Sequence, residues 1–350
     1  MRIVVDAMGG DLAPSATVSG ANLALNDDRL SDLEIILVGQ EEAIQAQLQN
    51  GAPLPRRLQI REASQVVSMK ESPTKAVKHK PDSSIAVGIN LLQNNEADAF
   101  VSAGNTGAVL TSSLLSLGRI EGVNRPTIGS FFPTEKGGCV VFDVGANPDA
   151  KSINLLQFGI MGSIYAKHIF NIEYPKVGLL NIGEERTKGT DVLIDAYGML
   201  EQELENFVGN IEGRDIMAGD VDVVVCDGFV GNVLLKFGES IFDSVMHMVN
   251  RELDKKPLAK FGALLMQSTM ESIAEQFSYE EHGGVPLLGV NGVSIISHGS
   301  STPKAIQNAI GVAHKMVNEE INTIIEQELK THQVTSPSMP QVDDPLVPQG

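Results

Sequence analysis

Short β-branched runs alternate with longer helical patterns along most of the chain. Nine apolar runs, each followed by a turn or a helical pattern, are predicted to be strands: 2–6, 33–39, 58–62, 98–102, 127–132, 139–144, 176–182, 221–227 and 293–297. Helices are predicted over 14–25, 82–93, 106–118, 152–170 and from Pro303 to about Leu329, where proline opens the first turn. This alternation is typical of a parallel or mixed sheet that helices cover on both faces.

Two segments depart from this alternation. From Gly238 to His282 there is no strand pattern, and two helix-like stretches are joined at ELDKKPLAKFG. We expect this segment to be a pair of helices that protrudes from the main body. The tail, 331–350, has four prolines and almost no core-forming residues. Its composition predicts a disordered extension.

Composition and charge narrow the possible partners. The chain has 350 residues, of which 42% are hydrophobic, so it can form the core of one large domain or of two ordinary ones. It carries 44 acidic and 26 basic side chains, for a net charge of -18. A nucleic acid partner is therefore not expected, and any anionic partner must meet a local basic patch.

The cysteines and the amino terminus indicate an ordinary intracellular protein. Cys139 and Cys226 lie in strand-like runs without metal-ligand spacing, which predicts buried thiols. The start, MRIVVDAMGG, lacks the apolar stretch of a signal peptide, and no run approaches the ~20 apolar residues of a membrane span. We expect a cytoplasmic location.

Six loops that follow predicted strands combine glycine with small polar residues. They are DAMGGD (6–11), SAGNTG (102–107), DVGAN (143–147), NIGEERTKG (181–189), DGFVGN (227–232) and SHGSS (297–301). In a doubly wound sheet the strand ends share one edge, and ligands bind in the crevice there. We therefore expect all six loops to line a single site.

The loop 102–107 has the composition of an anion cradle. Gly104 and Gly107 allow close approach of the backbone to a ligand, and Asn105 or Thr106 can cap the helix that follows. The free N–H groups and the helix dipole then favour an anion, most simply a phosphate. For this loop alone, a capped helix with no bound ion remains the alternative.

Charged residues in and near these loops have two interpretations each. Arg186 and Lys188 lie beside a helix start and suit a phosphate or an oxyanion, although a residue of this kind, taken singly, is more often a solvated loop charge. His298 is either an acid, base or phosphate donor, or a structural histidine. The stretch KESPTKAVKHK (70–80) sets four lysines against one glutamate. It is either a docking patch for an acidic partner or a solvated helical face.

Several familiar mechanisms lack their motifs. The chain has no G-x-S-x-G, no G-x-x-x-x-G-K-[ST] and no strict G-x-G-x-x-G, which argues against a covalent serine mechanism, ATP hydrolysis and simple dinucleotide binding. Asp191 and Asp195, four residues apart on one helix face, could ligate Mg²⁺ and keep a metal-dependent dehydrogenase as an alternative. The simpler interpretation is an acid favoured by the helix dipole, followed by a solvated residue. We predict neither a metal nor a cofactor.

Taken in order, these motifs closely resemble the bacterial phosphate acyltransferase (PlsX) family, over Arg2 to about Ile310. The resemblance implies a three-layer α/β/α body with a mostly parallel, Rossmann-like sheet, related to phosphotransacetylases and to isocitrate and isopropylmalate dehydrogenases. We assign it to a single catalytic domain, 1–330. The resemblance also implies formation of acyl phosphate from long-chain acyl-[acyl carrier protein] and inorganic phosphate in phospholipid synthesis. A homodimer, peripheral membrane association and a glycerol-3-phosphate acyltransferase partner are further implications.

The absence of a protein nucleophile suggests that a phosphate oxygen attacks the thioester directly. The predicted catalytic residues are Asn105, Thr106, Arg186, Lys188, Asn232 and His298. The predicted substrate-binding residues are Asp6, Gly9, Gly10, Ser102, Gly104, Gly107, Asp143, Gly145, Asn147, Gly189, Asp227, Gly228 and Gly231. The acyl carrier protein would bind Lys70, Lys75, Lys78 and Lys80, and the membrane would contact Leu258, Phe261 and Leu264. A non-catalytic scaffold that binds the carrier through 70–80 is a further alternative.

Overall fold

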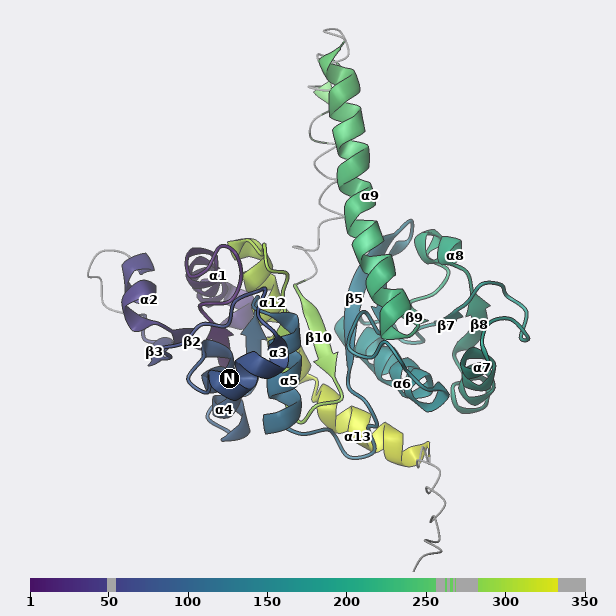
Figure 1. Ribbon diagram of the computed structural model, residues 1–350, viewed down its shortest axis with the longest axis horizontal. Helices are drawn as coiled ribbons and strands as arrows, with labels where there is room; N and C mark the ends of the chain where they lie inside the picture. The colour runs from purple at the N-terminus through teal and green to yellow at the C-terminus, as the bar shows by residue number, and fades with distance from the viewer. Residues whose placement is uncertain (49–54, 256–261, 263–264, 267, 269–282, 333–350) are drawn as a thin grey trace, which may run out of the picture.

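One long twisted sheet runs through the whole molecule (Figure 1). The computed structural model describes residues 1–48, 55–255, 262, 265–266, 268 and 283–332. Within them the sheet has the strand order β3-β2-β1-β4-β11-β10-β5-β6-β9-β7-β8. The strands are β1 (Arg2–Asp6), β2 (Glu34–Gly39), β3 (Leu58–Glu62), β4 (Ala99–Ser102), β5 (Thr127–Thr134), β6 (Gly137–Phe142), β7 (Val177–Leu180), β8 (Phe207–Ile211), β9 (Val223–Val225), β10 (Val285–Leu288) and β11 (Val293–Ile296).

Helices cover both faces of this sheet, so the fold has three layers, as expected. One face packs against α3 (Pro73–His79), α4 (Ser84–Gln93), α5 (Thr106–Ser116), α8 (Gly213–Ala218) and α9 (Gly228–Asp254). The other packs against α1 (Ser15–Leu25), the short helix η1 (Asp28–Leu30), α2 (Glu41–Gln47), α6 (Ser152–Ile169), α7 (Asp191–Glu203), α12 (Pro303–Asn318) and α13 (Ile321–Thr331). Each face has its own apolar core, because buried strand residues alternate between the two sides.

All nine predicted strands are present, and two further strands were missed. β10 contains Pro286 and β8 contains Gly209 and Asn210, residue types that weaken a strand pattern. The single long helix predicted after Pro303 is wrong. It is broken into α12 and α13 at Glu320, whose φ of 51° lies in the left-handed region and cannot continue a helix. Both cysteines are buried as expected, and burial raises the pKa of Cys139 to about 12.

The expectation that all six loops share one edge is also wrong. β1, β4 and β11 are mutually parallel, but the central pairings β11–β10, β10–β5 and β5–β6 are antiparallel. Beyond them β6, β9, β7 and β8 are parallel again. Three successive reversals leave the strands of the second half running opposite to those of the first. The carboxyl ends of β1, β4 and β11 therefore point to one edge of the sheet, and those of β6, β7 and β9 to the other.

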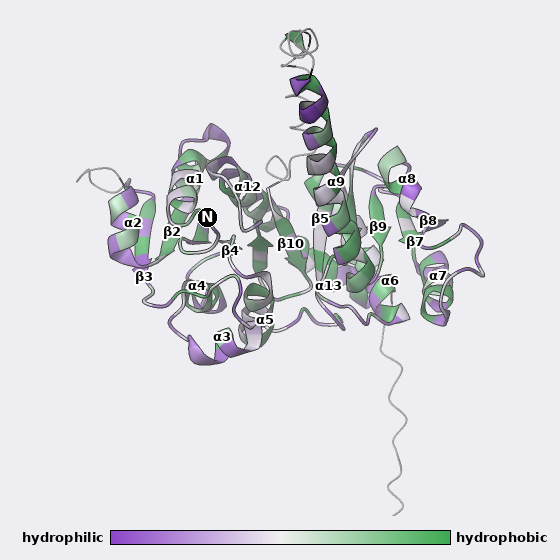
Figure 2. Cartoon of the chain, turned by 45° about the horizontal axis from the view of Figure 1, so that its top comes forward, coloured by the Kyte–Doolittle hydropathy of each residue, from purple (hydrophilic) through white to green (hydrophobic). Residues whose placement is uncertain are grey.

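The long helix α9 protrudes from the body, as Figures 1 and 2 show. It begins at Gly228, not at Gly238, because the Asp227 side chain caps its first turn by accepting a hydrogen bond from Val230 N at 2.9 Å. Along its length it exposes the apolar side chains of Phe229, Val230, Val233, Phe237, Ile241, Val245 and Met248. None of the described helices is both long and apolar enough to cross a bilayer.

Some expectations fall on residues that the structure does not describe. They include most of the second helix of the predicted pair, the membrane-contact candidates Leu258, Phe261 and Leu264, and the tail from residue 333 onward.

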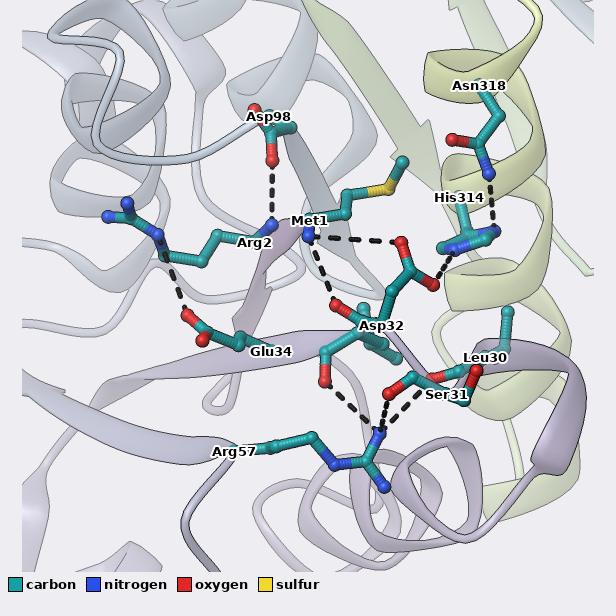
Figure 3. Close-up of polar contacts among 11 residues, drawn as sticks. Met1, Arg2, Leu30, Ser31, Asp32, Glu34, Arg57, Asp98, His314 and Asn318 are labelled. Atoms are coloured by element: carbon teal, nitrogen blue, oxygen red, sulfur yellow. Dashed lines mark hydrogen bonds and ion pairs between the residues drawn. The ribbon is translucent and has the colours of Figure 1, made fainter.

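Asp32 joins the helix α12 to the start of β2, at the edge of the sheet opposite the loops that follow β1 and β4 (Figure 3). His314 Nε2 lies 2.8 Å from Asp32 Oδ1, and His314 Nδ1 lies 3.2 Å from Asn318 Nδ2. The Met1 amino group donates to the Asp32 carbonyl at 3.1 Å. This cluster fastens three segments that are far apart in the sequence.

The cluster should make stability depend on pH. The hydrogen bond from His314 lowers the pKa of Asp32 below its usual value. A carboxyl group with a lowered folded pKa stabilises the fold above its unfolded pKa, about 3.9, and loses that contribution as the pH falls through the folded value. We expect Asp32→Asn to lower the free energy of unfolding at neutral pH, with the difference from wild type shrinking as the pH falls below about 3.9.

Urea unfolding at a series of pH values measures this difference. Asp28→Asn, at an exposed position nearby in sequence, is the matched control and should show no such trend. A deficit of Asp32→Asn that stays constant from neutral to acid pH would mean that the carboxylate charge has no part in it.

Candidate functional site

Three of the six loops meet at one edge of the sheet, and we call them the first loop group (6–11, 102–107 and 297–301). They follow β1, β4 and β11, which are neighbours in the sheet. Asp11 N donates to the Gly299 carbonyl at 2.6 Å, and a Cβ added to Gly9 would lie 2.6 Å from Gly104 N. The chain passes from β1 to β2 on one side of β1, and later from β3 to β4 on the other side of β1. The group therefore lies at a topological switch point, where sheets of this kind bind ligands.

The buried side chain of Asp6 connects two of these loops, 6–11 and 102–107. Its buried carboxylate accepts hydrogen bonds from Ser102 Oγ at 2.6 Å and from Met8 N at 3.1 Å. Ser102 Oγ in turn accepts from Gly104 N at 3.0 Å. Burial raises the pKa of Asp6, although these hydrogen bonds oppose the shift. Asp6 and Ser102, predicted to bind substrate, thus support the loops from within the protein.

Asn105 caps α5 and fixes a distant turn to it. Its Oδ1 accepts from Ala108 N at 3.0 Å, and its Nδ2 lies 3.2, 3.1 and 3.0 Å from the carbonyl oxygens of Ser68, Met69 and Glu71. The amide is therefore engaged on both sides. The sequence predicted that Asn105 could cap the helix. It contains no signal for the contacts of Asn105 with residues 68–71.

The remaining hydrogen-bond donors of this loop are the Thr106 hydroxyl and backbone N–H groups. Thr106 is exposed in the first turn of α5, and the N–H groups of Thr106 and Gly107 have no acceptor among the described residues. These N–H groups, with the dipole of α5, provide the anion-binding feature that the loop composition predicted. In the neighbouring loop, His298 is exposed, and its Nδ1 lies 2.7 Å from Ser300 Oγ.

The other three loops form a second loop group (143–147, 181–189 and 227–232) at the opposite edge. Here the buried Asp143 carboxylate occupies the amides of its own turn. It accepts from Gly145 N and Ala146 N at 3.0 Å, and from both Asn147 N and Asn147 Nδ2 at 2.7 Å. Burial raises the pKa of Asp143. The donors expected to bind phosphate in this turn are therefore already bonded within the protein.

The loop 227–232 packs on the same turn. Gly228 N donates to the Asn147 carbonyl at 2.8 Å, and a Cβ added to Gly231 would overlap the Asp143 carbonyl oxygen. Asn232, a predicted catalytic residue, has its side chain against Gly145. Gly228 and Gly231 therefore serve close backbone packing between the turn after β6 and the start of α9.

Arg186 and Lys188 are exposed and paired with acids in their own half. Arg186 Nη1 lies 2.8 Å from Glu201 Oε2, and its guanidinium lies 5.2 Å from the centre of the Tyr197 ring. Lys188 Nζ lies 3.8 Å from Glu185 Oε1. The described contacts do not bring either cation to the first loop group, so the structure divides the predicted catalytic set between two edges.

Asp191 and Asp195 are both exposed on α7. Among the described residues, no group of three or more His, Cys, Asp or Glu side chains is arranged to hold a metal ion. The dehydrogenase alternative thus gains no support from this pair.

The lysine patch borders the first loop group. Lys80 points inward, where its Nζ donates to the Val66 carbonyl at 2.8 Å and to Glu71 Oε2 at 2.7 Å. Lys70, Lys75 and Lys78 are exposed and form no ion pair with a described residue. The helix α3 that carries two of them lies against α5, where a Cβ added to Gly107 would overlap Pro73 Cγ.

Comparison with solved structures identifies the class of fold. The chain is similar to the EutD phosphotransacetylase from Staphylococcus aureus, with a TM-score of 0.57, 14% identity, and coverage of 91% of this chain and 94% of the other. A phosphotransacetylase from Streptococcus pyogenes gives a TM-score of 0.55 and 17% identity, with 94% of each chain covered. At these identities the likeness shows a shared phosphotransacetylase-like α/β/α fold.

Sequence comparison identifies the family. A family model described as fatty acid synthesis protein matches residues 1–324. The phosphate acyltransferase of Desulfitobacterium hafniense (strain DSM 10664 / DCB-2) is 51% identical over 94% of this chain and 98% of its own length. That of Heliobacterium modesticaldum is 49% identical over the same shares. The chain belongs to the phosphate acyltransferase family. It is an enzyme of the acyltransferase class that acts in fatty acid and phospholipid synthesis.

The second loop group supports a test of how Asp143 acts. An amide at position 143 would relieve the cost of burying a charge, but its NH₂ would face N–H donors that now share four bonds to the carboxylate. Unpaired buried donors cost about 1–3 kcal/mol, so we expect Asp143→Asn to lower the free energy of unfolding by about that amount, measured by urea denaturation. Asp149→Asn, exposed in the same connection, should change it little. A more stable Asp143→Asn protein would show that charge burial dominates.

Proposed function

We propose that a single catalytic domain, 1–330, transfers the acyl group of long-chain acyl-[acyl carrier protein] to inorganic phosphate. A phosphate oxygen attacks the thioester carbonyl carbon, a C–O bond forms, the C–S bond breaks, and the carrier leaves as a thiolate that takes up a proton. The observation that carries the proposal is the meeting of three glycine-rich loops at the switch point, beside helix amides that have no acceptor among the described residues. Family membership supports the same reaction.

We assign the phosphate to the first loop group. The amides of Thr106 and Gly107 and the dipole of α5 favour a dianion at this point. The same donors can stabilise the tetrahedral oxyanion, the kind of contact that often contributes most to acyl transfer. Phosphate supplies the nucleophile, so the protein need not. His298, exposed in the third loop, is the candidate for a proton donor or a phosphate contact.

The second loop group is not assigned to the same ion. Its turn amides bond to Asp143, and its cations pair with Glu201 and Glu185. We therefore do not assign the binding of this phosphate ion to Arg186, Lys188 or Asn232. They stay candidates for another role in the reaction.

We propose that the acyl carrier protein docks on Lys70, Lys75 and Lys78. The carrier is small and acidic, and these side chains are exposed beside the first loop group in a chain of net charge -18. Lys80 is omitted from the docking patch because its ammonium is occupied by Glu71.

We further propose a homodimer and a membrane contact. The exposed apolar stripe along α9 supports a homodimer, because a large exposed apolar surface typically marks an interface. The proposed membrane contact at Leu258, Phe261 and Leu264 and the glycerol-3-phosphate acyltransferase partner rest on the resemblance alone. Both concern delivery of acyl phosphate at the membrane surface.

The reaction is tested by its requirement for phosphate. Long-chain acyl-[acyl carrier protein] incubated with the protein should release free carrier thiol only when phosphate is present, with equal formation of acyl phosphate, measured by a thiol reagent and mass spectrometry. Thiol release without phosphate would indicate a thioesterase, and no release at all would indicate a non-catalytic scaffold.

Two further measurements test the alternatives. Loss of activity with a chelator would favour the metal-dependent alternative. A loss of about 2–4 kcal/mol in Lys188→Ala, the scale of one oxyanion donor, would bring the second loop group into the reaction.

The docking patch is tested by charge reversal. We expect the double variant Lys75→Glu/Lys78→Glu to raise the KM for acyl-[acyl carrier protein] at least tenfold at low salt and to leave the KM for phosphate unchanged, because rim charges act mainly on association. Lys167→Glu/Lys176→Glu makes the same change in net charge at exposed positions in the second half of the sheet. Equal effects in the two double variants would show that only net charge matters and would remove the patch.

A further inference from the structure

The turn at residues 68–71 is a rigid platform beside the first loop group. Glu71 N donates to the Ser68 carbonyl at 3.1 Å, which closes the turn. The Asn105 amide holds three of its carbonyl groups, and Lys80 Nζ holds the Glu71 carboxylate at 2.7 Å. The backbone of this turn is therefore fixed to the loop 102–107 before any ligand arrives.

This platform presents one apolar side chain over the loop group. A Cβ added to Gly299 would lie 2.7 Å from Met69 Cε, so the methionine methyl group occupies the space that a side chain at 299 would fill. The rest of Met69 is open, with 40% of the residue exposed. Lys70, the next residue, is exposed and belongs to the proposed docking patch.

We propose that Met69 is a substrate-binding residue that contacts the arm through which the carrier presents its thioester. The inference rests on the proposed function. A carrier docked on the lysines must reach phosphate in the loop group. Met69 is next to Lys70 in the chain, and its methyl group lies against Gly299 of that loop group. The carrier's pantetheine arm is uncharged and flexible, and an unbranched, polarizable methionine adapts to such a ligand. The acyl chain continues beyond the thioester carbonyl, so it does not need to meet this residue.

Steady-state kinetics of Met69→Ala test this contact. We expect the KM for acyl-[acyl carrier protein] to rise about fivefold to tenfold, the scale of one lost apolar contact, with kcat and the KM for phosphate nearly unchanged. The factor should be the same for octanoyl and palmitoyl carriers, because the arm is common to both. Met69→Leu, similar in volume, should restore most of the affinity. Leu115→Ala, which removes a 73% exposed apolar side chain farther along α5, is the control and should have no effect.

A double-mutant cycle with Gly299→Ala tests the location. The added methyl group should displace the Met69 side chain and raise the same KM in the wild-type background, but add little to Met69→Ala, where the space is open. The inference is overturned by an unchanged carrier KM in Met69→Ala, by an effect that grows with acyl length, or by additive changes in the cycle. If wild type forms no acyl phosphate at all, the proposed function itself fails.

Discussion

The buried carboxylate of Asp6 is the interaction on which the candidate site depends. It lies at the end of β1 and accepts hydrogen bonds from Met8 N in its own loop and from Ser102 Oγ at the start of the loop after β4, so two glycine-rich loops from neighbouring strands meet in one fixed arrangement. Burying a carboxylate is costly unless its oxygens are hydrogen-bonded, and here backbone and hydroxyl donors meet that requirement. The N–H groups of Thr106 and Gly107 at the start of α5 lie outside this network and have no acceptor among the described residues.

The second half of the sheet uses the same device with the opposite consequence. Asp143 directly follows β6, and its carboxylate also accepts hydrogen bonds from its own turn. Here, however, the donors are three successive backbone N–H groups of that turn. The turn then has few donors left for an external anion. Two loops of similar composition thus differ in chemistry, because what matters is which donors the protein itself consumes.

Electrostatics and packing converge on the first half. In a strongly acidic chain, three exposed lysines lie on a segment that Asn105 fastens to the candidate phosphate loop. A single amide side chain therefore caps α5 and also holds the turn that leads to the proposed docking patch. The turn that it holds also carries Met69 to the edge of the loop group. The proposed docking patch and the proposed phosphate site are thus joined through one short segment, 68–71.

The sequence by itself determined the local elements, the buried thiols, the glycine-rich strand ends and the family, because each depends on residue types that are close together in the chain. Even the reversal at β5–β6 left a signal: only six residues separate the two predicted strands, too few for a parallel crossover. The tertiary structure alone decided that the six loops divide between two edges, because strand direction in the centre is set by β10, whose proline-containing pattern is weak. It also decided which polar groups stay available, since the partners of Asn105 are more than thirty residues away and those of Asp6 nearly a hundred. The near partners, Met8 N for Asp6 and Ala108 N for Asn105, follow from the local sequence. Partners at the larger separations are chosen by packing, which local composition does not encode.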